Sequence, residues 1–257
     1  TILVVDDNPD MTDFLKRTFE GYFKRIIIAG DGGEALQLVR SHVPDIIVSD
    51  VMMPRMNGYK LCKTIKEDIN ISHIPVILLT ARDDRQSQIS GYKNGADGYL
   101  SKPFEVEMLM ELIRNRLKNR EYTKKRYLNA GLIPTPEEST ISLTDETFLI
   151  KLNSIIQENI ENSNLGIQFI CQEVGLGRSS LYNKLKALTG MGANEYISKL
   201  RIEKAITLIS GTDMPFSEIA EKTGFTTPSY FSTAFKQYTG ETPSQYKERK
   251  KKGLADK

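Results

Sequence analysis

The sequence predicts two parts, a doubly wound parallel α/β domain followed by an all-helical domain. Within the first 118 residues, five short apolar runs are each followed by a pattern of helical spacing. Residues 131–140 are rich in Pro, Thr and Glu, with little to bury, and beyond residue 145 the periodicity is helical only. A chain of 257 residues has room for two ordinary domains.

Composition excludes several classes of protein. No apolar run approaches the roughly 20 residues that span a bilayer, and the first residues resemble a strand rather than a signal peptide, so we expect a cytoplasmic chain. Cys62 and Cys171 belong to no Cys-x-x-Cys pair, and His42 and His73 are isolated, which argues against disulfide, zinc and catalytic-triad chemistry. The formal charge of +2 is too small to indicate a nucleic-acid partner by itself.

The apolar runs of the first part predict five strands. The run Ile46-Ile47-Val48 is β-branched and unbroken, as in a strand buried on both faces of a parallel sheet. Strands are expected at 2–5, 26–29, 46–50, 76–81 and 99–101, with helices between them, including one around Ile89 and Tyr92. The turn Gly30-Asp31-Gly32-Gly33 lacks the spacing of a nucleotide-binding loop and is interpreted as a plain helix entry.

Chemically reactive residues follow these strands. Asp6 and Asp7 follow the first strand, Asp50 ends the third, Thr80 the fourth and Lys102 the fifth. The carboxyl ends of parallel strands meet at one edge of a sheet, where ligands bind, so these five side chains should gather there. A helix-capping role for Asp50 is the alternative, and the convergence argues against it.

The motifs at these strand ends resemble those of a response-regulator receiver domain. They are Val4-Val5-Asp6-Asp7-Asn8, Asp50 with Met53-Pro54 and Asn57-Gly58, Leu79-Thr80-Ala81, and Lys102-Pro103-Phe104. The resemblance implies a flavodoxin-like sheet of order 2-1-3-4-5, with Asp50 as the acceptor of a phosphoryl group from a histidine kinase. It also implies that Lys102 stabilises the phosphoryl group.

Crowded carboxylates demand a cation, and magnesium suits oxygen ligands. By the resemblance, Asp7, Asp50 and the backbone carbonyl of Met52 would bind magnesium directly, and Asp6 through water. Thr80 and Tyr99 would form the switch that responds to phosphorylation. A half-buried Tyr99 with no switching role remains the alternative.

The middle and second parts contain a basic helix, a linker and an internal repeat. Residues 119–144 continue the last helix of the first part with a basic run, either a solvated face or a DNA-phosphate contact, and then form a linker. The segment from Ile170 to Gly190 recurs from Ile219 to Gly240, offset by 49 residues before its turn and 50 after it. Each copy has the layout of a helix-turn-helix, and the 18 residues from Ala193 to Ser210 between them predict a connecting helix.

Residues 145–250 resemble an AraC-type DNA-binding domain, through Ser180-Leu181-Tyr182-Asn183-Lys184-Leu185 and Phe231-Ser232-Thr233-Ala234-Phe235-Lys236. Residues 251–257 would form a basic tail. Polar residues of the two recognition helices could reach base edges: Ser179, Tyr182, Asn183, Ser229, Ser232 and Thr233. Basic residues would neutralise phosphates: Arg178, Lys184, Lys186 and Lys236.

Together these features predict a non-enzymatic response regulator whose DNA binding and transcriptional output depend on phosphorylation of Asp50. Its partners would be a histidine kinase, double-stranded DNA and, when phosphorylated, a second copy of itself. A helical part that binds only protein is one alternative. An Asp-nucleophile phosphatase or phosphotransferase is another, but the first part leaves no room for a substrate cap.

The start at Thr1 also fits the C-terminal portion of a hybrid sensor, which would be cytoplasmic in a membrane-anchored parent that contains the kinase. A trimmed stand-alone regulator fits almost as well.

Overall fold

The computed structural model describes residues 1–81, 95–129 and 142–255, and the chain divides into two compact units. Unit 1 comprises Thr1–Thr147 with Ala187–Thr189, and unit 2 comprises Phe148–Lys186 with Gly190–Lys257. The helix predicted around Ile89 and Tyr92 and the linker predicted at 131–140 lie outside the described residues.

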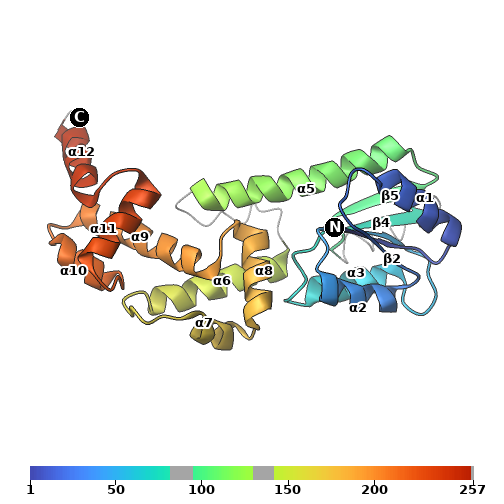
Figure 1. The fold of residues 1–257 in the computed structure, drawn as a ribbon, viewed down its shortest axis with the longest axis horizontal. Helices are drawn as coiled ribbons and strands as arrows, with labels where there is room; N and C mark the ends of the chain where they lie inside the picture. The colour runs from blue at the N-terminus through green and yellow to red at the C-terminus, as the bar shows by residue number, and fades with distance from the viewer. Residues whose placement is uncertain (82–94, 130–141, 256–257) are drawn as a thin grey trace. The chain divides into compact units, whose positions relative to one another are not determined.

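Unit 1 contains a five-stranded parallel sheet in the order β2-β1-β3-β4-β5, as predicted (Figure 1). The strands are β1 (Ile2–Val5), β2 (Ile26–Ala29), β3 (Ile46–Asp50), β4 (Val76–Ala81) and β5 (Gly98–Lys102). The register pairs Val5 with Ser49, so Asp6 and Asp50 follow at the same end of neighbouring strands. The central position of β3 explains its unbroken apolar sequence.

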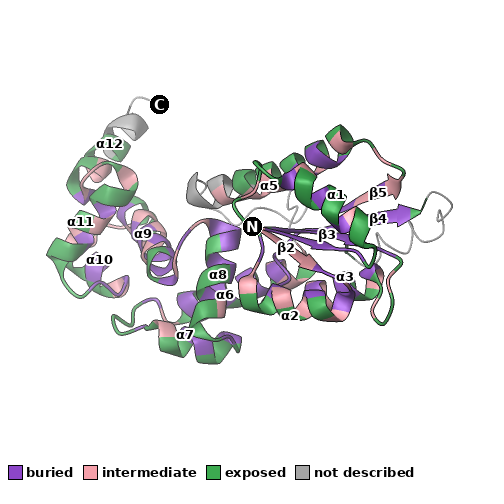
Figure 2. Ribbon diagram, turned by 45° about the vertical axis from the view of Figure 1, so that its right-hand side comes forward, coloured by how far each residue is buried: buried purple, intermediate pink, exposed green. Residues whose placement is uncertain are grey.

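Helices cover both faces of this sheet. Successive side chains of a strand point to opposite faces. Ile2 and Val4 accordingly pack in one core with residues of α1 (Pro9–Phe19) and α5 (Val106–Asn129), and Leu3 and Val5 pack in another. That second core includes residues of α2 (Gly32–His42) and α3 (Gly58–Glu67). In Figure 2 the strands are largely buried and the outer faces of the helices are exposed.

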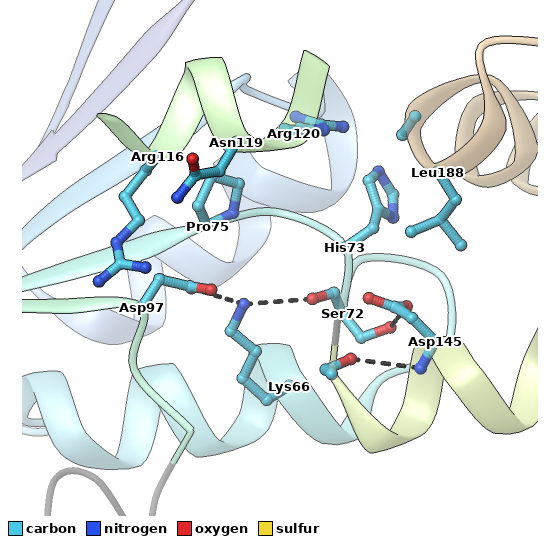
Figure 3. A pocket seen from close by; sticks show the side chains of 12 residues that line it. Lys66, Ser72, His73, Pro75, Asp97, Arg116, Asn119, Arg120, Asp145 and Leu188 are labelled. Carbon is cyan, nitrogen blue, oxygen red and sulfur yellow. Dashed lines mark hydrogen bonds and ion pairs between the residues drawn. The ribbon is translucent and has the colours of Figure 1, made fainter. Parts of the chain in front are cut away.

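A polar cluster lies at the opposite edge of the sheet from Asp50, where β4 and β5 begin (Figure 3). Lys66 Nζ pairs with Asp97 at 2.7 Å and donates to the Ile74 carbonyl at 2.9 Å. Asp97 also accepts a hydrogen bond from the Val76 amide at 2.7 Å. Ser72 donates to Asp145 at 2.7 Å. These bonds lie near the N-terminal ends of β4 and β5, whereas the reactive residues lie at the C-terminal ends of the strands.

The helical part has the predicted repeated arrangement. Its helices are α6 (Leu143–Glu158), α7 (Ile167–Val174), α8 (Arg178–Thr189), α9 (Ala193–Gly211), α10 (Phe216–Lys222), α11 (Pro228–Thr239) and α12 (Pro243–Ala255). The pairs α7–α8 and α10–α11 form the two helix-turn-helix copies, and α9 connects them. At 19 residues, α9 is about 28 Å long.

The two helix-turn-helix turns share one hydrogen-bond pattern. In the first, the Gly175 amide donates to Gln172 at 3.3 Å and the Leu176 amide to Cys171 at 3.0 Å. In the second, the Gly224 amide donates to Glu221 and the Phe225 amide to Ala220, both at 2.9 Å. Both glycines have left-handed backbones, with φ of 74° and 71°. These bonds cap the first helix of each copy, which explains why Gly recurs at this point of the repeat.

The second copy is held together by aromatic residues. Phe231 and Phe235 are fully buried, with ring centroids 5.7 Å apart. Phe225 contacts Phe231 at 5.3 Å, and Tyr246 of α12 contacts Phe235 at 5.6 Å. Leu181 and Leu185 of α8, like Phe231 and Phe235 of α11, are buried. Within the three described ranges, no helix has both the length and the apolar character needed to cross a membrane.

Candidate functional site

Three of the five strand-end residues of unit 1 meet: Asp6, Asp50 and Lys102. Lys102 Nζ lies 2.9 Å from Asp6 Oδ2 and 2.5 Å from Asp50 Oδ1, although these residues are 96 and 52 positions away in sequence. Asp6 and Asp50 are buried, and Thr80 at the end of β4 is 1% exposed. An ammonium-carboxylate cluster, with buried carboxylates and a half-buried Lys102, therefore lies at the carboxyl edge of the sheet.

The charges of this cluster influence one another. Burial raises the pKa of the Asp50 carboxyl above its usual value, since desolvation outweighs the hydrogen bond from Lys102, and the neighbouring Asp6 charge adds to the increase. For Lys102, burial acts to lower the pKa, but hydrogen bonds to Asp50 and Asp6 outweigh it and the pKa is raised. Lys102 therefore remains an ammonium, but its positive charge does not fully offset the effect of burial on the Asp50 carboxyl.

The loop after β3 folds back on Asp50. The Met52 amide donates to Asp50 Oδ2 at 2.6 Å, so each carboxylate oxygen of Asp50 has its own donor. The Gly58 amide donates to the Val51 carbonyl at 3.0 Å. A Cβ atom at Gly58 would lie 2.2 Å from the Asp50 carbonyl oxygen, so only glycine permits this approach. The glycine of the Asn57-Gly58 motif thus has a steric cause that the sequence alone did not reveal.

The other predicted receiver residues lie around this cluster. Asp7 is exposed, directly after buried Asp6. The Met52 side chain is 72% exposed, so its backbone, not its side chain, faces Asp50. The Thr80 hydroxyl lies 3.5 Å from the Ala81 carbonyl, and half-buried Tyr99 packs against the core on the α2–α3 side of the sheet. Lys102, Asp6 and Asp50 meet directly.

The donor chemistry of the cluster fits a hard divalent cation. Among the described residues, no group of three or more His, Cys, Asp or Glu side chains is arranged as a metal site, and Lys102 bridges Asp6 and Asp50. Magnesium prefers carboxylate and carbonyl oxygens, which are the kinds of oxygen in the ligand set predicted from the resemblance: Asp6, Asp7, Asp50 and the Met52 backbone. Because burial raises the pKa of Asp50, a nearby cation would oppose this shift by stabilising the ionised carboxylate.

In the helical part, most predicted DNA-contacting residues are solvent-accessible. Exposed or partly exposed residues lie on α8 and α11: Arg178, Ser179, Tyr182, Asn183, Lys186, Ser229, Ser232, Thr233 and Lys236. Arg178 donates to Gln168 at 3.4 Å, and the Thr233 hydroxyl donates to the Ser229 carbonyl at 3.1 Å. Tyr182 is 55% exposed, and so presents an aromatic side chain on the same helix as Asn183 and Lys186.

The prediction that Lys184 neutralises a phosphate is wrong for this structure. Lys184 is fully buried, and its ammonium lies over the Phe148 ring at 5.1 Å from the centroid. Helical spacing places Lys184 next to Leu181 and Leu185 on the inner face of α8, and a cation-π contact stabilises an ammonium there. Lys184 is therefore a packing residue, whereas Lys186 on the outer face is accessible.

Sequence reasoning also missed Arg201, a buried arginine of α9. Its Nη2 donates to the Asn162 carbonyl at 2.7 Å, and its guanidinium lies 6.0 Å from the centroid of the Phe225 ring. Asn162 follows α6, and Phe225 belongs to the turn of the second helix-turn-helix. Arg201 therefore connects elements of both halves of unit 2. The helical pattern of α9 gave no sign of this, because it marks Arg201 only as a charged residue.

Comparison with known proteins identifies both parts. Residues 2–114 match the family model described as the response regulator receiver domain. Unit 1 contains a receiver domain. Residues 170–249 match a helix-turn-helix domain model, and the second part is of the AraC type. The chain is thus a receiver domain followed by an AraC-type helix-turn-helix domain.

Two curated relatives and one solved structure illustrate this similarity. "Histidine kinase P4" of Formosa agariphila is 41% identical over 249 residues, which are 97% of this chain and 18% of that protein. The DNA-binding response regulator MtrA of Mycolicibacterium smegmatis is 36% identical over 130 residues, which are 51% of this chain and 56% of MtrA. The receiver domain of the Francisella response regulator 1452 is 41% identical, with a TM-score of 0.41, over 47% of this chain and 97% of that one. The chain thus spans only part of each curated relative.

Proposed function

We propose that this chain is a two-component transcription regulator in which phosphorylation of Asp50 by a histidine kinase controls sequence-specific DNA binding. The Lys102 ammonium held between Asp6 and Asp50 is the single observation that carries the proposal. The receiver and helix-turn-helix architecture, typical of non-enzymatic regulators, supports it further.

In the proposed reaction, an Asp50 oxygen attacks the phosphorus of a phosphohistidine. The P–N bond breaks, its electron pair goes to the imidazole, and an acyl phosphate forms on Asp50. Phosphoryl transfer depends mainly on positioning and on neutralising charge at the phosphoryl oxygens. Lys102 supplies a fixed positive charge, and the Met52 amide orients the carboxylate.

Magnesium, when bound, would neutralise the negative charge of the phosphoryl group. Asp6, Asp7, Asp50 and the Met52 carbonyl are the proposed groups that would hold it. Thr80 and Tyr99 are the proposed switch residues, through which the phosphorylated site would shift the population between two packings. A phosphorylated dimer is also proposed, and light scattering before and after phosphorylation would detect it.

Base reading is proposed for the exposed polar residues of α8 and α11: Ser179, Tyr182, Asn183, Ser229, Ser232 and Thr233. Arg178, Lys186 and Lys236 would contact phosphates. The similarity to "Histidine kinase P4" across nearly the whole chain supports a further proposal, that the same arrangement serves within a longer sensor that contains its own kinase.

A gel shift with fragments of the genome tests this function. The full chain is treated with a small phosphodonor and magnesium, alongside Asp50→Ala and the control Asp13→Ala, which removes an exposed carboxylate of α1. We expect phosphodonor-dependent binding by the wild type and by Asp13→Ala, but not by Asp50→Ala. If no genomic fragment is bound by any form, the helical part does not bind DNA, and the protein-binding alternative gains support.

A further inference from the structure

The loop at residues 51–57 controls the surroundings of Asp50. It contains Met52, whose amide donates to Asp50 Oδ2, and it ends at Gly58, which packs against the Asp50 backbone. Since the loop carries groups that touch the phosphoacceptor, anything that holds the loop also holds the geometry of the site.

The turn between β2 and α2 contacts this loop directly. The Gly32 amide donates to the Met56 carbonyl at 3.2 Å, and a Cβ at Gly32 would lie 2.6 Å from the same oxygen. Arg55 Nε donates to Asp31 Oδ2 at 2.9 Å, and Arg55 Nη2 donates to that oxygen as well. The glycine-containing turn, which the sequence presented as a plain helix entry, is thus an anchor for the loop.

Asp31 serves two structures at once. Its Oδ1 caps α2 by accepting from the Gly33 amide at 2.6 Å and the Glu34 amide at 3.0 Å, while Oδ2 accepts from Arg55. The Glu34 amide and then the Arg55 guanidinium hold the pKa of Asp31 below its usual value, so Asp31 is a carboxylate at neutral pH. The side chain is 9% exposed and is fixed by its cap, so it offers Arg55 a rigid partner.

The backbone of Arg55 has a conformation that is unusual for arginine. Its φ is +62°, in the left-handed region that residues other than Gly, Asn and Asp rarely adopt. The Arg55 side chain is 75% exposed, yet it makes two bonds to one carboxylate oxygen. An arginine is an unfavourable choice for this backbone, unless its side chain has a task that Gly or Asn cannot perform.

We propose that Asp31 and Arg55 form a clamp that positions the loop at 51–57, and with it the Met52 backbone, for phosphorylation and magnesium binding at Asp50. Both are positioning residues, because neither touches Asp50. The clamp rests on the proposed function only for its consequence at Asp50, since its contacts with the loop are independent of that function. Exposed ion pairs reach about 1 kcal/mol, which corresponds to an effect of about fivefold on loop closure.

Three substitutions in the full chain test the clamp. Arg55→Asn removes the guanidinium and tolerates a left-handed backbone. Arg55→Lys keeps one charged donor. Asp31→Asn keeps a side-chain oxygen for the helix cap and removes the charge. The control Arg40→Gln breaks another Arg–Asp bridge of unit 1, Arg40 with Asp68 at 3.0 Å, without touching the loop.

Amide hydrogen exchange of residues 51–57, measured by mass spectrometry, reports the clamp without any ligand. Titration calorimetry with magnesium alone and phosphoryl uptake from acetyl phosphate report its consequence. We expect about fivefold faster exchange, about fivefold weaker magnesium binding and slower phosphoryl uptake in Arg55→Asn and Asp31→Asn. The double variant should add little, Arg55→Lys should recover part of the loss, and Arg40→Gln should match the wild type.

The possible failures are distinguishable. If the wild type takes up no phosphoryl group, the proposed function fails, while the exchange data still judge the clamp. If exchange at 51–57 in Arg55→Asn equals that of the wild type, the clamp is overturned, whatever the phosphorylation result. Faster exchange with unchanged magnesium binding and phosphoryl uptake also overturns it, because the loop would then be held for stability alone.

Discussion

Gly175 and Gly224 occupy equivalent positions in the two helix-turn-helix copies but should respond very differently to alanine. Both have left-handed backbones, which cost a non-glycine residue about 1–2 kcal/mol. A Cβ at Gly175 meets nothing within 4 Å. At Gly224 it would lie 2.2 Å from the Ile160 carbonyl oxygen and 2.9 Å from Arg201 Nη2. Forcing an atom into such a contact costs about 1–3 kcal/mol more.

We therefore expect Gly175→Ala to destabilise unit 2 by about 1–2 kcal/mol and Gly224→Ala by about 2–5 kcal/mol. For a domain of this size, 1 kcal/mol lowers the melting temperature by about 4–8 °C. Differential scanning calorimetry of the full chain should thus show a larger decrease for Gly224→Ala in the transition assigned to the helical unit. Equal decreases would refute the close approach of the second turn to Ile160 and Arg201.

Three other predictions concern single side chains. Burial raises the pKa of Cys62 to about 12. In a Cys171→Ala background, iodoacetamide at pH about 8 should therefore label Cys62 only after unfolding. Rapid labelling of the folded protein would contradict the burial of this thiol. Because the unfolded thiol ionises first, this group lowers stability as pH rises from about 8.5 towards 12. Lys186→Ala should reduce the slope of the logarithm of the DNA-binding constant against the logarithm of salt concentration by about 1, and Lys184→Met should leave that slope unchanged. Equal reductions would contradict the burial of Lys184. Ile47→Ala, in central β3, should lower the free energy of unfolding measured in urea by about 2–5 kcal/mol. A decrease below about 1 kcal/mol would contradict the full burial of Ile47.

The arrangement of the sheet could be predicted because its strands are short, apolar and separated by clear turns. Parallel strands place their carboxyl ends at one edge, so the meeting of Asp6, Asp50 and Lys102 followed from their positions after strands. The repeat likewise predicted two helix-turn-helix copies, since the same residues recur at each turn.

Contacts made by side chains across distant elements could not be predicted in this way. Lys184 was predicted to contact a phosphate because of its charge alone. Its position on the helix places it on the same buried face as Leu181 and Leu185. The Asp31–Arg55 pair joins two turns 24 residues apart, and Arg201 joins the segment after α6 to the turn of the second helix-turn-helix copy. Such pairs depend on packing in three dimensions, which no local pattern of one sequence contains.

The most direct test of the central claim measures phosphorylation and DNA binding in the same sample. The full chain is treated with acetyl phosphate and magnesium, phosphoryl incorporation is mapped by mass spectrometry, and affinity for a bound genomic fragment is measured by fluorescence anisotropy. We expect a phosphoryl group on Asp50 and a change in affinity of several-fold that Asp50→Ala abolishes and Asp13→Ala leaves intact. Phosphorylation of Asp50 with no change in affinity, or equal responses from the wild type and Asp50→Ala, would contradict the central claim.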